Sequence, residues 1–244
     1  MTSWARFRAG FASPQRAFLN LNLLRDRYEA ALAGLPRIEG PAIVLGSAPN
    51  PVRPAGVDES WFTITVNASQ VTAADLGLGE PELTVLRDDI FTPGEHQDAV
   101  WKALAGRRTA HLVAVQASSD DRGVARGIAE RNYHAGHVTE LSRHTRGAII
   151  AEMSGRYHVK ISSGVSNGIF AMLLALKLGG RPVVMAGFSF GPGWHFAQST
   201  TGHRGHIKAD RATCEAVAAR GLPVFAADPA FAEASGLPIW TGHG

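Results

Sequence analysis

Residues 162–190 read SSGVSNGIFAMLLALKLGGRPVVMAGFSF, and this stretch decides the fold. Apolar residues occupy almost every position from Ile169 to Leu178, which is typical of a helix that is buried on all sides. Gly179 and Gly180 end that helix, and Pro182 opens a short apolar run that suits a buried strand. A buried helix followed directly by a buried strand favours a parallel sheet that is covered by helices.

The rest of the chain repeats this alternation of strand and helix patterns. Short apolar runs bounded by turn residues are typical of buried strands, whereas apolar residues at every third or fourth position are typical of helices. The expected strands cover residues 42–45, 62–66, 83–86, 111–115, 183–186 and 224–226. The expected helices cover residues 98–105, 122–132, 166–178 and 208–220. We therefore expect an α/β fold with a doubly wound, mostly parallel sheet that carries helices on both faces.

The chain divides into two parts, the second of which contains an insertion. Residues 1–40 form an amino-terminal helical segment, because Ser13 and Pro14 make a typical helix start. Residues 41–244 form a single α/β domain. Within it, residues 117–160 are rich in charge and glycine, and we expect them to form a lid-like insertion rather than a separate domain.

The composition excludes several classes of protein. The chain has 244 residues, is 45% hydrophobic and carries a single cysteine, so an internal disulfide and a cysteine-based zinc site are excluded. No apolar run reaches the roughly 18 residues of a membrane-spanning helix. The start of the chain lacks the apolar core of a signal peptide, so the reducing cytoplasm is the expected compartment.

The net charge of +3 is too small to favour nucleic acid as a binding partner. Arginines near the start suit either a solvated helix face or peripheral contact with the anionic inner face of the membrane.

Ligands of open parallel sheets bind beyond the carboxyl ends of the strands, so the residues after each strand are candidates for a site. The first strand is followed by Gly46, Ser47, Ala48 and Pro49, whose small side chains would let a ligand approach the backbone. This loop lacks the three glycines of a dinucleotide fingerprint and the Gly-Lys-Ser/Thr of a Walker loop. An ordinary turn between strand and helix is the alternative.

Two further groups of polar residues are candidates for a site. Asn67 and Arg87 follow the second and third strands. Small polar residues also precede the buried helix, where free backbone N–H groups could bind an anion such as a phosphate. Plain capping of the helix is the alternative. These residues are Ser163, Gly164, Ser166, Asn167 and Gly168.

Three histidines, His195, His203 and His206, are close together in the stretch between the expected strand 183–186 and the expected helix 208–220. A neutral imidazole can take a proton from an acceptor hydroxyl, and it can also contact a phosphate. Metal binding and plain surface histidines are the alternatives. The spacing of seven and then two intervening residues matches no zinc signature.

The order of these motifs resembles that of the small bacterial sialyltransferases of glycosyltransferase family 42, which decorate lipooligosaccharide. The shared elements are a strand followed by Gly46–Pro49, a strand followed by Asn67, and the run from Ser166 through Ala186–Phe190 to Trp194–Phe196. The resemblance implies a glycosyltransferase-A-like variant of the Rossmann fold with a lid. It implies an inverting transferase that moves a sialic acid-like sugar, of the nonulosonic or Kdo type, from a CMP-sugar to a hydroxyl of a glycan or lipid-linked glycan. The family needs no metal or other cofactor for this transfer, so none is expected here.

The resemblance also assigns nucleotide contacts. Those that fall to this sequence are Gly46, Ser47, Ala48, Pro49, Asn67, Ser166, Asn167 and Gly168, with Ser163 and Gly164 as an alternative register. Arg87 stands where the family has a second asparagine, so the contact at this position is expected to differ.

For the chemical step, the resemblance implies that His203 is the catalytic base, or His206 if the loop carries no deletion. Neither place of the family's two phosphate-binding tyrosines holds a tyrosine, and the second falls on Trp194. We therefore expect His195 or Arg204 to neutralise the departing phosphate, since a charged donor is stronger than a phenol.

Two other functions remain open. A pterin pyrophosphokinase of the archaeal type has a similar Gly-X-X-Pro loop, and it would need magnesium held by carboxylates such as Asp88, Asp89 and Asp228. A non-catalytic module that binds a nucleotide or a glycan could share the same fold. A symmetric homo-oligomer is compatible with each of these functions.

Overall fold

The computed structural model describes residues 28–91, 94–116, 124–156, 164–191 and 205–242. Its centre is a seven-stranded sheet in the order β5-β4-β3-β2-β1-β6-β7, in which every neighbouring pair is parallel. The strands are β1 Ala42–Leu45, β2 Phe62–Val66, β3 Leu83–Arg87, β4 Arg108–Val115, β5 His134–Leu141, β6 Val183–Ala186 and β7 Val224–Ala226. The doubly wound parallel sheet expected from the sequence is thereby confirmed.

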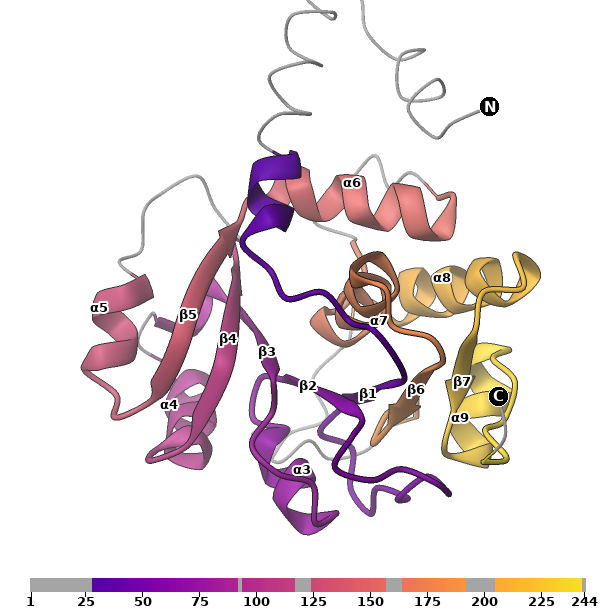
Figure 1. Cartoon of the computed structure of the whole chain (residues 1–244), viewed down its shortest axis with the longest axis horizontal. Coiled ribbons are helices and arrows are strands. Elements are labelled where there is room, and N and C mark those ends of the chain that lie inside the picture. Colours follow the sequence, from indigo (N-terminus) through magenta and orange to yellow (C-terminus); the bar gives the residue numbers. More distant parts are fainter. Residues whose placement is uncertain (1–27, 92–93, 117–123, 157–163, 192–204, 243–244) are drawn as a thin grey trace, which may run out of the picture.

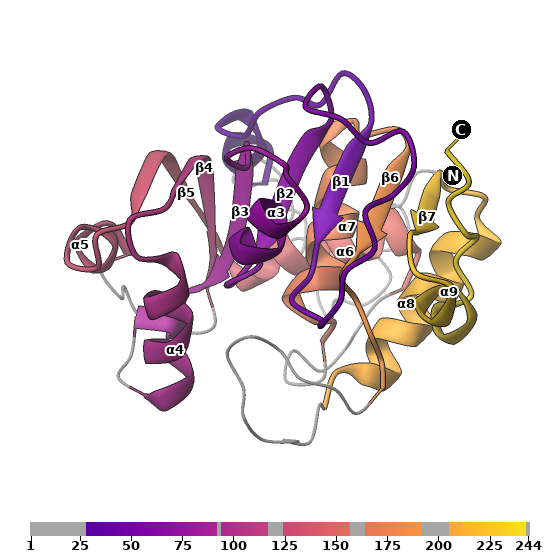
Figure 2. The same cartoon turned by 90° about the horizontal axis from the view of Figure 1, so that it is seen from below.

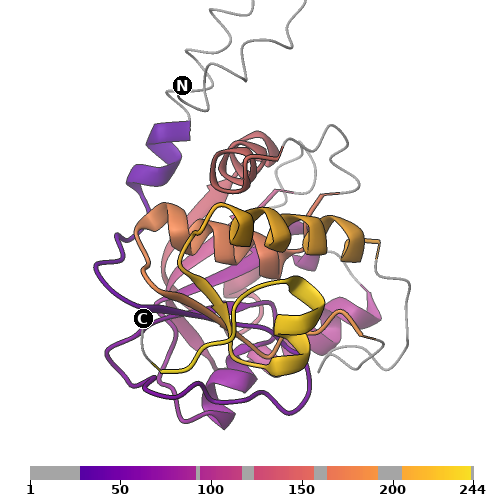
Figure 3. The same ribbon diagram turned by 90° about the vertical axis from the view of Figure 1, so that its right-hand side faces the viewer.

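Helices cover both faces of this sheet. They are α3 Gln70–Asp75, α4 Glu95–Leu104, α5 Val124–Ala129, α6 Arg143–Ser154, α7 Asn167–Leu178, α8 Ile207–Ala219 and α9 Pro229–Ser235, with a 3₁₀ turn η2 at Asp88–Phe91. Helices α6, α7 and α8 lie on one face, whereas α3 and α4 lie on the other (Figure 1). Seen from below, α3 lies in front of β2 (Figure 2), and from the right-hand side α8 and α9 lie together beside β7 (Figure 3).

The two-residue period of β1 divides its side chains between two cores. Ala42 and Val44 belong to the core beneath α7, whereas Ile43 and Leu45 belong to a core on the opposite face. Helix α7 contacts the sheet on one side and α6 and α8 on the other, so nearly all of its side chains are buried. This position explains why the helix is apolar on every side.

The direction of winding reverses between β1 and β6. From β1 the chain builds outward through β2, β3, β4 and β5, whereas β6 pairs with the other side of β1 and is followed by β7. Such a switch point opens a crevice outside the carboxyl ends of the two strands. Gly46 follows β1 and Gly187 follows β6, so these two glycines lie at the crevice.

Several elements were not predicted from the sequence. Strand β5 is the edge of the sheet, and most of its residues are at least partly exposed, so it lacks the apolar run that marks a buried strand. Helices α3, α6 and α9 were also missed. Because β5 pairs with β4 and α6 packs on α7, the expectation of a lid is wrong for residues 134–154. The flanking segments 117–123 and 157–160 lie outside the described residues.

Most of the expected amino-terminal helix lies outside the described residues, as does any contact that it makes with a membrane. Its last turn, residues 28–33, is helical. Among the residues that the structure describes, no helix is both long and apolar enough to cross a membrane.

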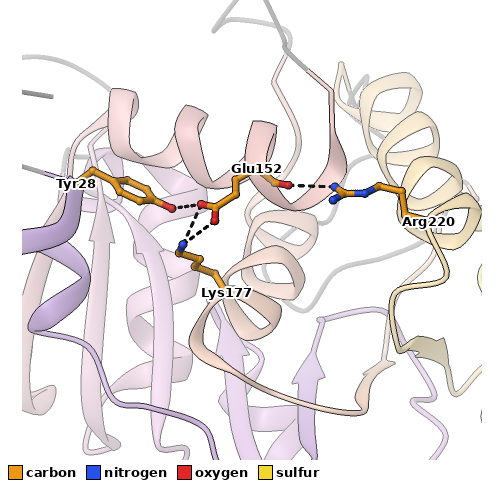
Figure 4. Close-up of polar contacts among 4 residues, drawn as sticks. All are labelled: Tyr28, Glu152, Lys177 and Arg220. Carbon is orange, nitrogen blue, oxygen red and sulfur yellow. Dashed lines mark hydrogen bonds and ion pairs between the residues drawn. The ribbon is translucent and has the colours of Figure 1, made fainter. Parts of the chain in front are cut away.

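A polar cluster joins that last turn to the helical layer (Figure 4). The Tyr28 hydroxyl donates to the carboxylate of Glu152 on α6, and Lys177 Nζ on α7 lies 2.8 and 2.9 Å from the two carboxylate oxygens. Arg220, which follows α8, donates to the Glu152 carbonyl over 3.0 Å. Burial, followed by the hydrogen bond to Glu152, raises the pKa of Tyr28. Glu152 therefore connects four segments of the chain.

Replacing Glu152 with alanine should lower the free energy of unfolding by about 1–3 kcal/mol, because it leaves Tyr28 and Lys177 without their acceptor in a partly buried position. Urea denaturation followed by circular dichroism would measure this change. The matched control is Glu80→Ala, since Glu80 pairs with Arg108 at the surface, where both side chains are more than half exposed. We expect less than about 1 kcal/mol for the control. Equal effects of the two substitutions would contradict the structural role of Glu152.

Candidate active site at the strand switch point

A cavity of about 370 Å³ opens beyond the carboxyl ends of β1, β2, β3 and β6. The first turns of α7 and α8 and part of α6 complete its wall. Eight of the residues that we named from the sequence line it: Gly46, Ser47, Asn67, Arg87, Ser166, Asn167, Gly168 and His206. Ala48 is buried, and neither it, Pro49 nor Gly164 lines the cavity. The rule for parallel sheets located Gly46, Ser47, Asn67 and Arg87. The pattern at the start of the buried helix gave Ser166, Asn167 and Gly168, and the histidine cluster gave His206.

The floor of the cavity is made of two backbones in close contact. Gly46 N donates to the Ala186 carbonyl over 2.9 Å, and Ala48 N donates to the Gly187 carbonyl over 2.9 Å. A Cβ on Gly46 would overlap the Gly187 carbonyl oxygen. Gly187 has φ 71°, and a Cβ there would lie 2.9 Å from the Gly46 carbonyl oxygen. Glycine at both positions therefore keeps the floor flat and lets a ligand reach main-chain groups.

Two asparagines form a polar side of the cavity. Asn67 has φ 53°, a conformation that asparagine tolerates better than most residues. Asn167 Nδ2 donates to Asn67 Oδ1 over 3.4 Å. The Asn167 Oδ1 atom is buried and has no hydrogen-bond partner among the described residues. A buried acceptor without a donor is costly, so this atom is available to an N–H or O–H group of a ligand.

His206 is held in one tautomer. Its Nδ1 lies 2.7 Å from the carbonyl oxygen of Gly164. Because a carbonyl can only accept, Nδ1 carries the proton, and Nε2 is the nitrogen with a lone pair. His206 lines the cavity at the amino end of α8. The imidazole is therefore arranged to accept a proton at Nε2.

Asp210 joins the starts of α7 and α8, and it was not predicted from the sequence. Its Oδ1 accepts a hydrogen bond from Ser166 N over 2.7 Å, and its own N–H donates to the His206 carbonyl over 2.8 Å. Burial raises the pKa of this carboxyl, and the hydrogen bonds from Ser166 oppose that rise. The carboxylate thus fixes Ser166, the N-cap of α7, beside His206.

Arg146 on α6 is the other functional candidate that sequence analysis missed. Its Nη2 donates to the Val165 carbonyl over 2.5 Å, and its guanidinium carbon lies 5.3 Å from the centre of the Phe170 ring. Burial is the main cause that lowers the pKa of Arg146 to about 10, and the positive charge of Arg87 lowers it further. Arg87 and Arg146 both line the cavity, which is therefore suited to an anion.

Five of the residues named from the sequence lie outside the described residues, so the roles given to them stay predictions. They are Ser163, Trp194, His195, His203 and Arg204.

Of the carboxylates considered for magnesium, Asp228 has a structural role away from the cavity. Asp228 Oδ1 accepts a hydrogen bond from Phe231 N over 3.0 Å, which makes it the N-cap of α9, and Asp228 does not line the cavity. Within the described part of the chain, no cluster of three or more histidine, cysteine or acidic side chains could hold a metal ion.

No protein-family model matches the chain, and no curated protein matches it in sequence. Solved structures do match its fold. One is the sialyltransferase CST-II in complex with a trisaccharide acceptor and CMP, with a TM-score of 0.53 and 10% identity over 84% of this chain and 89% of that one. Another is the monofunctional alpha-2,3-sialyltransferase Cst-I from Campylobacter jejuni, with a TM-score of 0.54 and 10% identity over 85% and 82% of the two chains. The glycosyltransferase-A-like Rossmann fold expected from the resemblance is thereby confirmed, apart from its lid.

Proposed function

We propose that this chain is an inverting glycosyltransferase that moves a sialic acid-like sugar, of the nonulosonic or Kdo type, from a CMP-sugar to a glycan hydroxyl. One observation carries the proposal. His206 has its Nδ1 proton bound to the Gly164 carbonyl, and it lines a cavity at the strand switch point of a fold shared with sialyltransferases. The polar and small residues around that cavity suit a nucleotide.

The proposed nucleotide site uses the floor and the asparagine side of the cavity. Gly46 and Gly187 let the ligand lie against the backbone, and the free acceptor Asn167 Oδ1 suits an amino or hydroxyl group of the cytidine. Ile169 N donates to the hydroxyl of the N-cap Ser166 over 3.3 Å. The N–H groups of Asn167 and Gly168 have no acceptor within α7, so they suit the phosphate of CMP.

In the proposed reaction, His206 Nε2 accepts the proton of the acceptor hydroxyl as its oxygen attacks the anomeric carbon. The bond between that carbon and the phosphate oxygen breaks at the same time, and CMP leaves with the electron pair. Attack from the face opposite the phosphate inverts the anomeric carbon. General base catalysis of this kind contributes on the order of 10² to 10⁴ in rate. His195 or Arg204 remains our prediction for the group that neutralises the departing phosphate, and His203 remains the alternative base.

The proposal also extends to the cellular role. The acceptor would be a glycan or lipid-linked glycan of the lipopolysaccharide or capsule type. The basic amino-terminal segment would hold the enzyme peripherally at an anionic membrane, where such acceptors lie. The chemistry would need no metal, since His195 or Arg204 would neutralise the departing phosphate.

CMP at about one hundred times its Kd should stabilise the protein by about 2.7 kcal/mol without any magnesium. For a chain of this length, such a gain corresponds to a rise of about 5–10 °C in the melting temperature. Differential scanning fluorimetry with CMP, CDP, ATP, GTP and UDP, each with and without magnesium, would measure it. Stabilisation only by a triphosphate with magnesium would favour pyrophosphoryl transfer instead. Stabilisation by CMP without any transfer from CMP-sugars would favour a binding module.

A further inference from the structure

The guanidinium of Arg146 is held in place by the protein, and one of its N–H donors has no acceptor among the described residues. Its Nη2 donates to Val165, and its guanidinium lies over the ring of Phe170. The Nε atom is buried and has no hydrogen-bond partner among the described residues. A buried guanidinium N–H has lost its water without a replacement, which indicates that an acceptor completes the site when a ligand is bound.

A second guanidinium faces the same cavity. Arg87 is the last residue of β3, and Arg146 lies in the first turn of α6. Two cationic side chains from separate elements therefore line the same cavity. Arg87 lowers the pKa of Arg146, which places the two charges within electrostatic reach of one another. Asp210 is the acidic residue of this lining, and one of its oxygens accepts from Ser166 N. Two like charges brought together in a partly closed space favour a bound anion.

These cations lie to one side of the proposed nucleotide site. The floor at Gly46 and Gly187 lies at the ends of β1 and β6, whereas Arg87 ends β3, which β2 separates from β1. Two strand spacings put Arg87 roughly 10 Å from the switch point. The phosphate of CMP already has suitable donors in the first turn of α7. The orphan donor of Arg146 is therefore available to a different anionic group.

We propose that Arg146 is a specificity-determining residue that binds, together with Arg87, the carboxylate of an acid sugar in the donor. This inference rests on the proposed function and deepens it. The cavity would select CMP-activated sugars that carry a carboxylate, because the planar guanidinium matches that group in shape and charge. A neutral sugar would leave the buried Nε without an acceptor.

The test compares three ligands by isothermal titration calorimetry. They are CMP, a fluorinated and therefore unreactive CMP-sialic acid, and the methyl ester of that compound, which lacks the carboxylate charge. The wild-type protein should bind the acid about tenfold or more tightly than the ester, as expected for one charged hydrogen bond. Arg146→Gln should lose about tenfold or more in affinity for the acid and less than about twofold for CMP and for the ester. Arg146→Lys should lie between the two.

The matched control is Arg143→Gln, which removes an exposed arginine one turn earlier on α6 and should leave all three affinities unchanged. The inference is overturned if the wild type binds acid and ester equally well, a comparison that needs no variant to fold. It is also overturned if Arg146→Gln weakens CMP as much as the acid, because the guanidinium would then bind the phosphate. Failure of the wild type to bind CMP at all would instead remove the proposed function, and this assignment with it.

Discussion

Replacing His206 with asparagine should lower kcat for transfer from a CMP-sugar by about 10² to 10⁴. Asparagine keeps an N–H donor in the position of Nδ1, so the hydrogen bond to the Gly164 carbonyl can remain. It has no nitrogen that can take up a proton, so the general base is lost. The Kd for CMP should change by less than about threefold, because the proposed nucleotide contacts lie on other residues. Steady-state kinetics and calorimetry on the same preparations would measure the two quantities.

Two further variants test whether His206 itself is the general base. His206→Gln removes the donor to Gly164 as well as the base, so it should lose at least as much activity and some thermal stability. His203→Asn tests the alternative base that the family resemblance implies. If the His203 variant loses activity on this scale while His206→Asn keeps near-normal kcat, the assignment of the base to His206 is wrong.

The strands of this fold could be predicted because most of them are buried on both faces. The runs at 42–45 and 183–186 are apolar throughout, since every side chain in them packs into one of two cores. Strand β5 gave no such signal, because it lies at the sheet edge and exposes residues such as His134 and Val138. Helix α6 was not predicted either, because it lies within residues 117–160, whose charge and glycine content suggested an insertion.

The same physical difference separates the parts of the cavity that could and could not be predicted. Gly46 and Asn67 directly follow strands and Arg87 ends one, so the rule for parallel sheets locates them without knowledge of side-chain packing. Arg146 and Asp210 lie within helices, and they reach the cavity only because α6 and α8 pack beside α7. No local pattern in the sequence encodes that packing, so only the assembled helical layer brings them to the site.

Replacing Gly46 with alanine should damage both stability and ligand binding, because the floor of the cavity has no room for a methyl group. The added Cβ would overlap the Gly187 carbonyl oxygen, which is main chain and cannot swing aside as a flexible side chain could. Forcing β1 and β6 apart at this point should cost about 1–3 kcal/mol, or about 2–12 °C in melting temperature for a chain of this size. CMP affinity should fall by about tenfold or more, since the same backbone approach is proposed to hold the nucleotide.

Gly40→Ala is the matched control, because a Cβ at Gly40 would meet nothing within 4 Å. It removes the same conformational freedom from the unfolded chain without the clash, so stability should change by less than about 0.5 kcal/mol and CMP binding should not change. Scanning fluorimetry and calorimetry on both variants would separate the two causes. A Gly46→Ala protein that melts with the wild type and binds CMP normally would mean that the β1–β6 floor can open by the width of a methyl group. The close approach of Gly46 and Gly187 would then have no part in holding the nucleotide.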